Sequence, residues 1–346
     1  MDSNHRFRIL VVAMPAAMMA LMAIASTAHA HHGFDTHYYR DRPVLIQGTV
    51  TEFQYINPHS FVHVSTTDEA GETVERWCEM QASSQMRIKG IGPDVLKVGD
   101  PVRIEGFQAR RDPLGCEFAT GYLADGTVLT LRTSGGQSLF AAPWQPDESG
   151  SIFGTWFRKA FPGAGSDPDP MDSYTEAGAA AHAANDQLVA NPVYQCSPVS
   201  PIRAWSQPGL PTEIRDEGER IVVHHEFMDA ERVVHLDMDE HPADAPRTTM
   251  GHSIGRYEDG DLIVHTALFA DGLLRSDFVR TMDLELTERF HINPDNGDLE
   301  VTWTATDPEF HNGTFSGSRI LMRTTLPLGT YGCTPGVGHG DQMDGG

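Results

Sequence analysis

The stretch VLIQGTVTEFQYINPHSFVHVSTT, residues 44–67, decides the fold of the first half of the chain. Apolar and polar residues alternate in two short runs on either side of Asn57-Pro58, which is typical of two strands separated by a turn. Three further runs follow, TVERWCEM, PVRIEGFQA and TVLTLR, with turn sequences such as DEAGE, KVGDP and ADG between them. The stretch SSQMRIKGIGPDVLKVGD leaves room for one short helix after the third run. Five strands with a helix after the third predict an OB-like β-barrel over residues 31–131.

The second half of the sequence is again mostly strand. Seven alternating runs follow residue 196, from RIVVHHEFM to SGSRILMRT, and EDGD and NPDNGD mark hairpin turns. Seven or eight antiparallel strands in meander order predict a lipocalin-like barrel or a strongly curved sheet over residues 196–335. Such a barrel can enclose one small ligand, but an interior filled by side chains is the commoner arrangement. We therefore predict an all-β protein.

Residues 132–195 differ in composition from both halves. The segments APWQPDESGS and FPGAGSDPDPMD are typical of a linker. One helix is expected in SYTEAGAAAHAANDQLVA, with Asp172 or Ser173 as its N-cap. The strand-like run SIFGTWFRK is a candidate to dock on the second domain. Residues 336–346 are expected to form a disordered tail.

Residues 1–30 are typical of an export signal peptide. Arg6 and Arg8 give a positive start, ILVVAMPAAMMALMAIA supplies the apolar core, and Ala28-His29-Ala30 supplies the small residues that a signal peptidase reads. Cleavage after Ala30 would make His31 the N-terminus of a periplasmic or secreted protein with no further membrane insertion. An uncleaved membrane anchor is the alternative, although no positive stop-transfer flank follows.

The strongly negative charge limits the possible partners. The formal net charge is −23, and removing Arg6, Arg8 and Asp2 with the signal peptide would change it to −24 (−23 − 2 + 1). Most surface patches would repel phosphate groups, which argues against nucleic acid as a partner. A metal ion or a small apolar ligand is expected instead.

The four cysteines suit an exported chain, because disulfides persist in oxidising compartments. Four cysteines allow three connectivities. One pair in each domain is the simplest choice, so we predict Cys78–Cys116 and Cys196–Cys333. Metal ligation by these thiols is the alternative, but the sequence has no CxxC or CxxH spacing.

The first half also resembles a known family. HHGFDTHYYRDRPVLIQGTVTEFQYINPHSFVHV, LKVGDPVRIEG and LADGTVL are similar to an uncharacterised bacterial exported family, a domain of unknown function. In the second half, RVVHLD and HPADAPRTTMGHSIGRYEDGDLIVHT resemble a second uncharacterised module, which is found fused to the first or alone. The resemblance implies export and supplies no chemistry.

The sequence HHGFDTH, residues 31–37, predicts a metal site at the mature N-terminus. A chain that begins with histidine carries an α-amine and an imidazole Nδ1 spaced to chelate one ion, and a second imidazole would complete a set of three nitrogens. This set resembles the histidine brace of copper-dependent polysaccharide monooxygenases and periplasmic copper carriers, in its ligands and not in fold. Three neutral nitrogens in a tetragonal arrangement suit Cu(II), so copper is the expected cofactor.

His59 is expected to supply the second imidazole, because Asn57-Pro58 fixes the chain just before the strand. His59 and His63 share one face of that strand by two-residue alternation. His32 is a competing ligand and His37 a weaker one. The candidate metal ligands are therefore His31, His32, His59 and His63. The alternative is an N-terminal histidine pair that binds copper only adventitiously.

The second half contains enough titratable residues to form a catalytic pocket, if several point into the barrel. The candidates are His252, Asp237, Glu288 and Arg256, with His252 and a carboxylate as acid and base. They support an alternative function, a periplasmic enzyme acting on an apolar small molecule. Strand parity alone leaves open which face is inside, and filled barrels would leave only an interaction role. The sequence does not decide whether the protein is an enzyme.

The motif GHSIG, residues 251–255, has the form of a serine nucleophile elbow. That motif requires a strand, a sharp turn and a helix, whereas a hairpin pattern, IGRYEDGDLIVHT, follows Ser253. We therefore expect the glycines to serve strand curvature or close packing and not hydrolysis.

Overall fold

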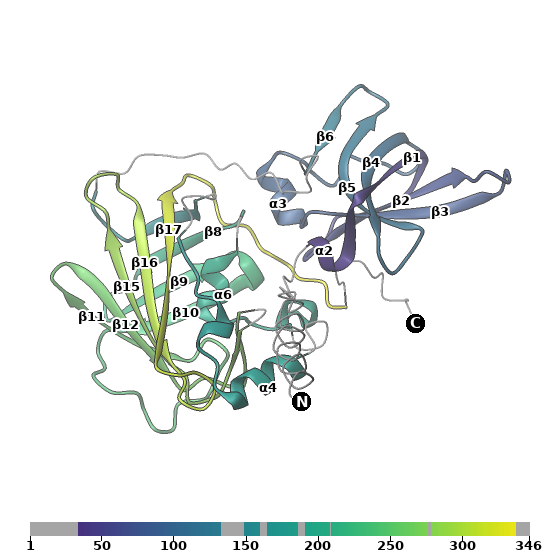
Figure 1. Cartoon of the computed structure of the whole chain (residues 1–346). Coiled ribbons are helices and arrows are strands. Elements are labelled where there is room, and N and C mark those ends of the chain that lie inside the picture. The colour runs from purple at the N-terminus through teal and green to yellow at the C-terminus, as the bar shows by residue number, and fades with distance from the viewer. Residues whose placement is uncertain are drawn as a thin grey trace, which may run out of the picture. The chain divides into compact units, whose positions relative to one another are not determined.

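The computed structural model describes residues 34–132, 149–159, 165–185, 191–207, 209–275 and 278–336. The predicted signal peptide, His31, His32 and the predicted tail beyond residue 336 lie outside these residues. Among the described helices, none is long and apolar enough to cross a membrane. The protein is all-β, as predicted, with a few short helices (Figure 1).

The first half forms a closed OB-like barrel. A short helix, α2 (Phe34–His37), precedes the strands, and α3 (Ser83–Ile88) lies between the third and fourth strands, as predicted. The sheet order is β3-β2-β1-β4-β5-β6, and a parallel pairing of β3 with β5 closes it. The strands are β1 (Tyr38–Gln54), β2 (Ser60–Thr67), β3 (Thr73–Met80), β4 (Pro101–Ala109), β5 (Gly115–Leu123) and β6 (Val128–Thr130).

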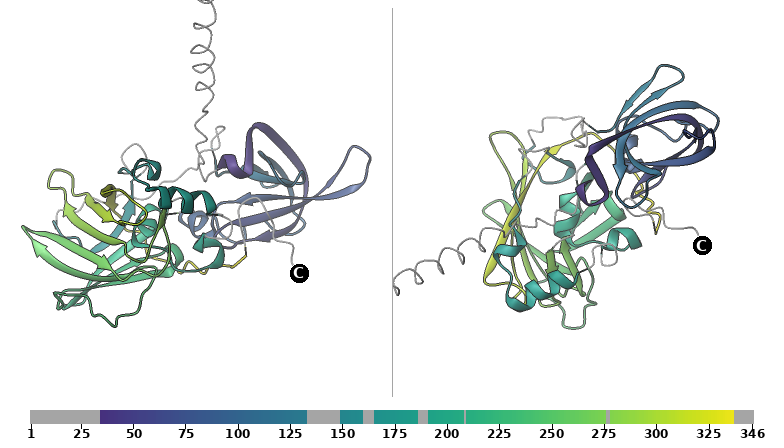
Figure 2. Two further views of the ribbon diagram at one scale, coloured as in Figure 1. Left: turned by 60° about the horizontal axis from the view of Figure 1, so that its bottom comes forward. Right: turned by 45° about the vertical axis from the view of Figure 1, so that its right-hand side comes forward.

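Six strands form this module where five were predicted, because the sequence pattern had not indicated β5. The β2–β3 hairpin extends beyond the rest of the module in Figure 1, and the left view of Figure 2 also shows this. The register pairs Trp77 with Gly115 and Cys78 with Cys116 across β3 and β5. Gly115 is required there, since a Cβ at this position would lie 2.3 Å from the Trp77 ring.

The predicted Cys78–Cys116 disulfide lies in the core of the OB-like module. Both cysteines are fully buried, with their Cα atoms 4.4 Å apart. They pack with the inward-facing apolar side chains of the strands, among them Val62, Ile104 and Phe118. The disulfide therefore ties together the two strands that close the barrel.

The second half forms a closed barrel of nine strands (Figure 1). The strands follow one another round the barrel in chain order, and β17 pairs with β7 to close it. They are β7 (Gly154–Arg158), β8 (Pro211–Asp216), β9 (Arg220–His225), β10 (Ala230–His235), β11 (His252–Glu258), β12 (Asp261–Ala267), β15 (Glu285–Ile292), β16 (Leu299–Thr306) and β17 (Thr314–Arg323).

This barrel has more strands than the seven or eight predicted, and one pair is parallel. The extra strands are β8 and β7, the latter formed by the run that was expected to dock on this domain. A closed ring with an odd number of strands must contain a parallel pair, here β10 and β11. Residues 236–251 make the crossover connection that this pair needs.

Short elements cover the barrel. They are η2 (Pro170–Asp172), α4 (Glu176–Ala184), η3 (Pro192–Gln195), α6 (Pro201–Ser206), η4 (Phe227–Asp229) and the hairpin of β13 (Gly272–Arg275) with β14 (Phe278–Arg280). The N-cap of α4 is Thr175, whose Oγ1 accepts a hydrogen bond from the Gly178 nitrogen. Asp172 and Ser173, the predicted caps, lie before it.

The second predicted disulfide, Cys196–Cys333, is also present. It joins the segment before α6 to the chain that follows β17. Next to it, the Thr334 nitrogen donates a hydrogen bond of 2.7 Å to the Asn57 carbonyl of the OB-like module. The C-terminal segment is therefore held by a disulfide and, one residue later, by a hydrogen bond to the OB-like module.

Replacing Cys196 and Cys333 by serine should lower the free energy of unfolding by about 5 kcal/mol, because the bond closes a loop of 137 residues in the unfolded chain. Urea-induced unfolding of the oxidised wild type and of the Cys196→Ser/Cys333→Ser variant measures the difference. Equal stability of the two proteins would contradict the expectation.

Candidate functional site

The turn before β2 holds His59 in a fixed place. The Asn57–Pro58 peptide is cis, and Asn57 is buried. The Asn57 Oδ1 accepts hydrogen bonds from the Ser84 nitrogen (3.2 Å) and the Ser84 hydroxyl (3.0 Å). Its carbonyl accepts the bond from Thr334. The Asn-Pro-His motif is therefore tied to α3 and to the C-terminal segment, which leaves His59 at the start of a rigid strand.

Glu79 lies at the centre of the candidate site. It is fully buried, and one of its carboxylate oxygens lies 2.9 Å from Nδ1 of His59. The Tyr38 hydroxyl donates a hydrogen bond to the other oxygen. Glu117 occupies the paired position on β5, where the Arg132 guanidinium forms an ion pair with it. Two buried carboxylates thus lie side by side on the outer face of the OB-like module.

Burial and the neighbouring charges shift the pKa of Tyr38. Burial, followed by the negative charges of Glu79 and Glu117, raises the pKa of the phenol well above its ordinary value. Tyr38 therefore remains a neutral hydrogen-bond donor. The carboxylate of Glu79 is in turn held by a phenol and an imidazole.

His63 lies on the same face but at a different place. Its Nδ1 is 3.5 Å from Glu75, and the rings of Phe61 and Trp77 pack between the two histidines at a centroid distance of 5.9 Å. Four residues along a strand span about 13 Å, and the imidazoles of His59 and His63 lie against different carboxylates, so the structure does not bring the two histidines together. Of the candidate ligands, His31 and His32 lie outside the described residues.

The N-terminal end of the described chain lies against this site. The Phe34 ring packs edge-on against Phe107, with centroids 5.1 Å apart, and lies 5.5 Å from the Tyr38 ring. The Arg132 guanidinium lies 5.6 Å from the same ring. Phe34 therefore contacts the residues that hold Glu79 and Glu117.

The catalytic candidates of the C-terminal barrel are divided between its two faces. Glu288 is fully buried inside the barrel. His252 precedes the inward-facing Ser253 and therefore points outward, and Arg256 is exposed and paired with Glu258. Asp237 is exposed at 3.8 Å from His235. His252 and Glu288 lie on opposite sides of the barrel wall, so the structure does not bring the four residues together.

A polar layer crosses the barrel interior, and the sequence had not indicated it. Six consecutive strands, from β8 to β15, each contribute one inward-facing polar residue. Arg232 lies at its centre, 2.5 Å from Glu288, and donates hydrogen bonds to Ser253 (2.8 Å) and Thr266 (2.6 Å). The indole Nε1 of Trp205, in α6, donates to Glu288 at 3.0 Å. The remaining members of the layer are Thr212 and His225.

The interior of this barrel is filled. The Trp205 ring packs edge-on against His225 with centroids 4.6 Å apart. Ser253, the serine of GHSIG, is buried in mid-strand, and a Cβ at Gly255 would lie 2.6 Å from Val234. The glycine of this motif therefore serves close packing, as predicted.

Four histidines form a second group, the outer histidine cluster, on the outer face of this barrel. Nδ1 of His241 lies 2.8 Å from Nδ1 of His252, and its Nε2 lies 2.8 Å from Nδ1 of His265. His235 stacks on His252 with ring centroids 5.0 Å apart. Burial and the two neighbouring imidazoles lower the pKa of His241 to about 4, and burial and His235 lower that of His252.

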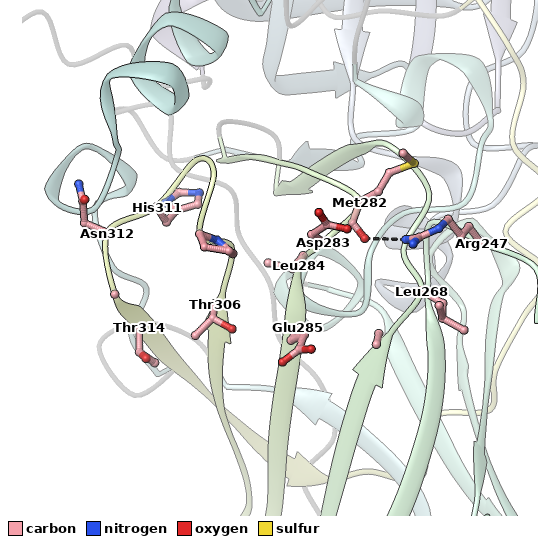
Figure 3. Close-up of a pocket in the computed structure, with 13 residues that line it drawn as sticks. Arg247, Leu268, Met282, Asp283, Leu284, Glu285, Thr306, His311, Asn312 and Thr314 are labelled. Carbon is pink, nitrogen blue, oxygen red and sulfur yellow. Dashed lines mark hydrogen bonds between the residues drawn. The ribbon is translucent and has the colours of Figure 1, made fainter. Parts of the chain in front are cut away.

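An open pocket of about 810 Å³ lies at one end of the barrel (Figure 3). Arg247 and Leu268 lie on one side of it and His311 and Asn312 on the other. None of the predicted catalytic residues lines it. His311 is buried, and its ring nitrogens contact the Ser173 hydroxyl (2.9 Å) and the Val279 carbonyl (3.1 Å).

Among the described residues, no group of three or more His, Cys, Asp or Glu side chains surrounds a point where a metal ion could lie. The arrangement on the OB-like module consists of one imidazole, oriented by a buried carboxylate. Such an imidazole can act as one ligand of an ion whose other ligands come from elsewhere.

Glu288→Gln should lower the free energy of unfolding by about 3–5 kcal/mol, because it leaves the Arg232 guanidinium buried without its counter-charge. Glu258→Gln is the matched control: it removes the partner of the exposed Arg256 and should cost about 1 kcal/mol or less. Urea-induced unfolding measures both. Equal losses in the two variants would show that the buried pair is no more important than the exposed one.

Burial lowers the pKa of His225 to about 3, so the free energy of unfolding should depend on pH. In the unfolded chain this imidazole binds a proton near its ordinary pKa of about 6.5, whereas the folded protein does not. Stability is therefore expected to fall as the pH is lowered from about 6.5 towards 3. Urea unfolding at pH 7 and pH 4.5 measures the slope, which His225→Gln should reduce; an unchanged slope would contradict this assignment.

Comparison with known proteins covers only the first half. Neither a curated protein nor a solved structure matches the chain. Residues 18–116, the stretch that carries His59 and Glu79, match a family of unknown function (DUF6152), which confirms the resemblance to an uncharacterised domain.

Proposed function

We propose that the mature protein is an exported metal-binding protein that holds Cu(II) between its N-terminal His31 and His59 of the OB-like module. The observation that carries this proposal is the contact of 2.9 Å between His59 Nδ1 and the buried Glu79 carboxylate. Metal-bound histidines usually donate their second ring N–H to such a carboxylate, which fixes the tautomer and orients the ring. Glu79 would leave Nε2 as the ligating nitrogen of His59.

Chain connectivity supports the proposal. Two residues, His32 and Gly33, separate His31 from Phe34. An extended chain spans at most about 3.6 Å per residue step, so the three steps limit the distance between the two Cα atoms to about 11 Å. Phe34 packs beside Tyr38, which donates its hydroxyl hydrogen to Glu79. The described chain therefore begins beside the phenol that holds Glu79, the carboxylate in contact with His59.

The charge and chemistry of the site support a cation with nitrogen ligands. Glu79 and Glu117 place two carboxylates side by side at this site, and Arg132 forms an ion pair with Glu117. The α-amine and imidazole of His31 together with the His59 imidazole supply three nitrogens, the set that Cu(II) prefers among divalent ions. The brace requires cleavage after Ala30, so a signal peptide and a periplasmic or secreted location are part of the proposal. The two disulfides support an oxidising compartment.

Copper titration of the mature protein with an authentic His31 terminus tests the proposal. One extra residue before His31 removes the chelating amine, and His59→Ala removes the third nitrogen. Each should lower the Cu(II) affinity by orders of magnitude while circular dichroism stays unchanged. Glu79→Gln should lower it by about 10–100-fold, because the orienting carboxylate is lost. Competition with a coloured chelator measures the affinities.

His182→Ala is the matched control, since this histidine lies in α4 of the other half and should leave the affinity unchanged. Equal affinities of the native and the extended terminus would reject the brace. In that case HHGF is only a histidine-rich tail that binds copper adventitiously.

A further inference from the structure

The strand register brings the outer histidine cluster together. Ile254 of β11 pairs with His235 on one side and with His265 on the other, so both histidines share its outward face. His252 lies two residues before Ile254 and points the same way. The crossover connection 236–251 places His241 against His252 and His265. Three neighbouring strands and one connection thus present imidazoles at a single place.

We propose that the outer histidine cluster is a second metal site of this protein, for one divalent ion of the borderline class that imidazole prefers, such as Zn²⁺ or Cu²⁺. The site lies on the C-terminal barrel and uses none of the residues proposed for the brace. The four imidazoles contact one another in a chain, from His235 to His252, His241 and His265. Because they lie on the outer face of the barrel, they do not serve to fill its apolar core. Their shared chemistry is ligation through ring nitrogens.

The shortest approach in the cluster suits an ion. The Nδ1 atoms of His241 and His252 are 2.8 Å apart. With metal–nitrogen bonds of about 2.0–2.1 Å, an ion bound to both would have a nitrogen–metal–nitrogen angle of about 85°, close to the right angle between neighbouring ligands in tetragonal or octahedral sites. The two nitrogens are therefore close enough to chelate one ion once both rings turn towards it.

The third ligand requires one ring to turn. No three side chains of the cluster face a common point among the described residues, because His241 uses its two nitrogens towards different partners. The rings of His235 and His265 lie within 5.0 and 5.1 Å of the rings of the chelating pair, so rotation about their side-chain torsions can bring a third nitrogen to the ion. Binding would thereby fasten the crossover connection to the barrel wall.

The surroundings of the cluster attract cations. The connection carries four acidic residues, Asp237, Asp239, Glu240 and Asp244. Asp237 lies two residues after His235, and Asp239 and Glu240 come just before His241. The Asp237 carboxylate is 3.8 Å from the His235 imidazole. A site with this charge concentrates divalent ions and supplies a carboxylate as a further ligand.

Zn²⁺ titration of the full mature protein, in competition with a coloured chelator, tests the inference. The His241→Ala/His252→Ala variant should lose one equivalent of bound Zn²⁺. His291→Ala is the matched control: this half-exposed histidine pairs with Asp261 on the same barrel and should leave the stoichiometry unchanged. His241→Gln changes a single residue of the connection and should weaken the same equivalent, with thermal unfolding as the check that the barrel is intact.

The outcome is separable from that of the proposed copper site. If His59→Ala leaves metal binding unchanged while the cluster variant loses an equivalent, the second site stands without the brace. If the cluster variant binds as much Zn²⁺ as the native protein, or if His291→Ala loses as much as the cluster variant, the inference is overturned.

Discussion

The parallel pairing of β3 with β5 is the constraint on which the candidate site depends. It closes the OB-like barrel, and the Cys78–Cys116 bond joins the two strands on their inner face. Because side chains alternate along a strand, two cysteines fixed inside place the next residues, Glu79 and Glu117, side by side outside. Backbone and disulfide together therefore hold two carboxylates that would otherwise repel each other, and nearby polar groups compensate for their burial.

Strand alternation was sufficient to predict both barrels, but it failed for strands that do not alternate. β5, with the sequence GCEFATGYL, is buried on both faces over its first five residues, so its pattern resembles neither an exposed strand nor a turn. β8 is short and begins with a proline. Both are recognisable only from the strands that pair with them in the folded sheet. The cysteines were easier to place, because one pair per domain left a single choice.

The candidate site was also predictable only in part, because some of its residues come together only in the folded chain. His59 stood out because a proline fixes the chain before it, which is a local signal. Glu79 and Tyr38 are 41 residues apart and meet only after the barrel closes. In the second half, the alternation of side chains along each strand assigns residues to two faces, but it does not show which face points into the barrel. Residues that looked like one catalytic group, such as His252 and Glu288, were therefore divided by the barrel wall.

The closure of the second barrel has a consequence for the export that we propose for this chain. Its first strand, β7, pairs with its last, β17, so that Arg158 meets Leu321. A chain that crosses a membrane from its N-terminus onward presents β7 long before β17 arrives. Until then β7 lacks its neighbour on one side, and an open sheet edge can pair with another chain. The OB-like module can close earlier, since its strands end at Thr130. Secretion would therefore yield a folded first module attached to an open sheet, for which the export compartment must provide time and protection.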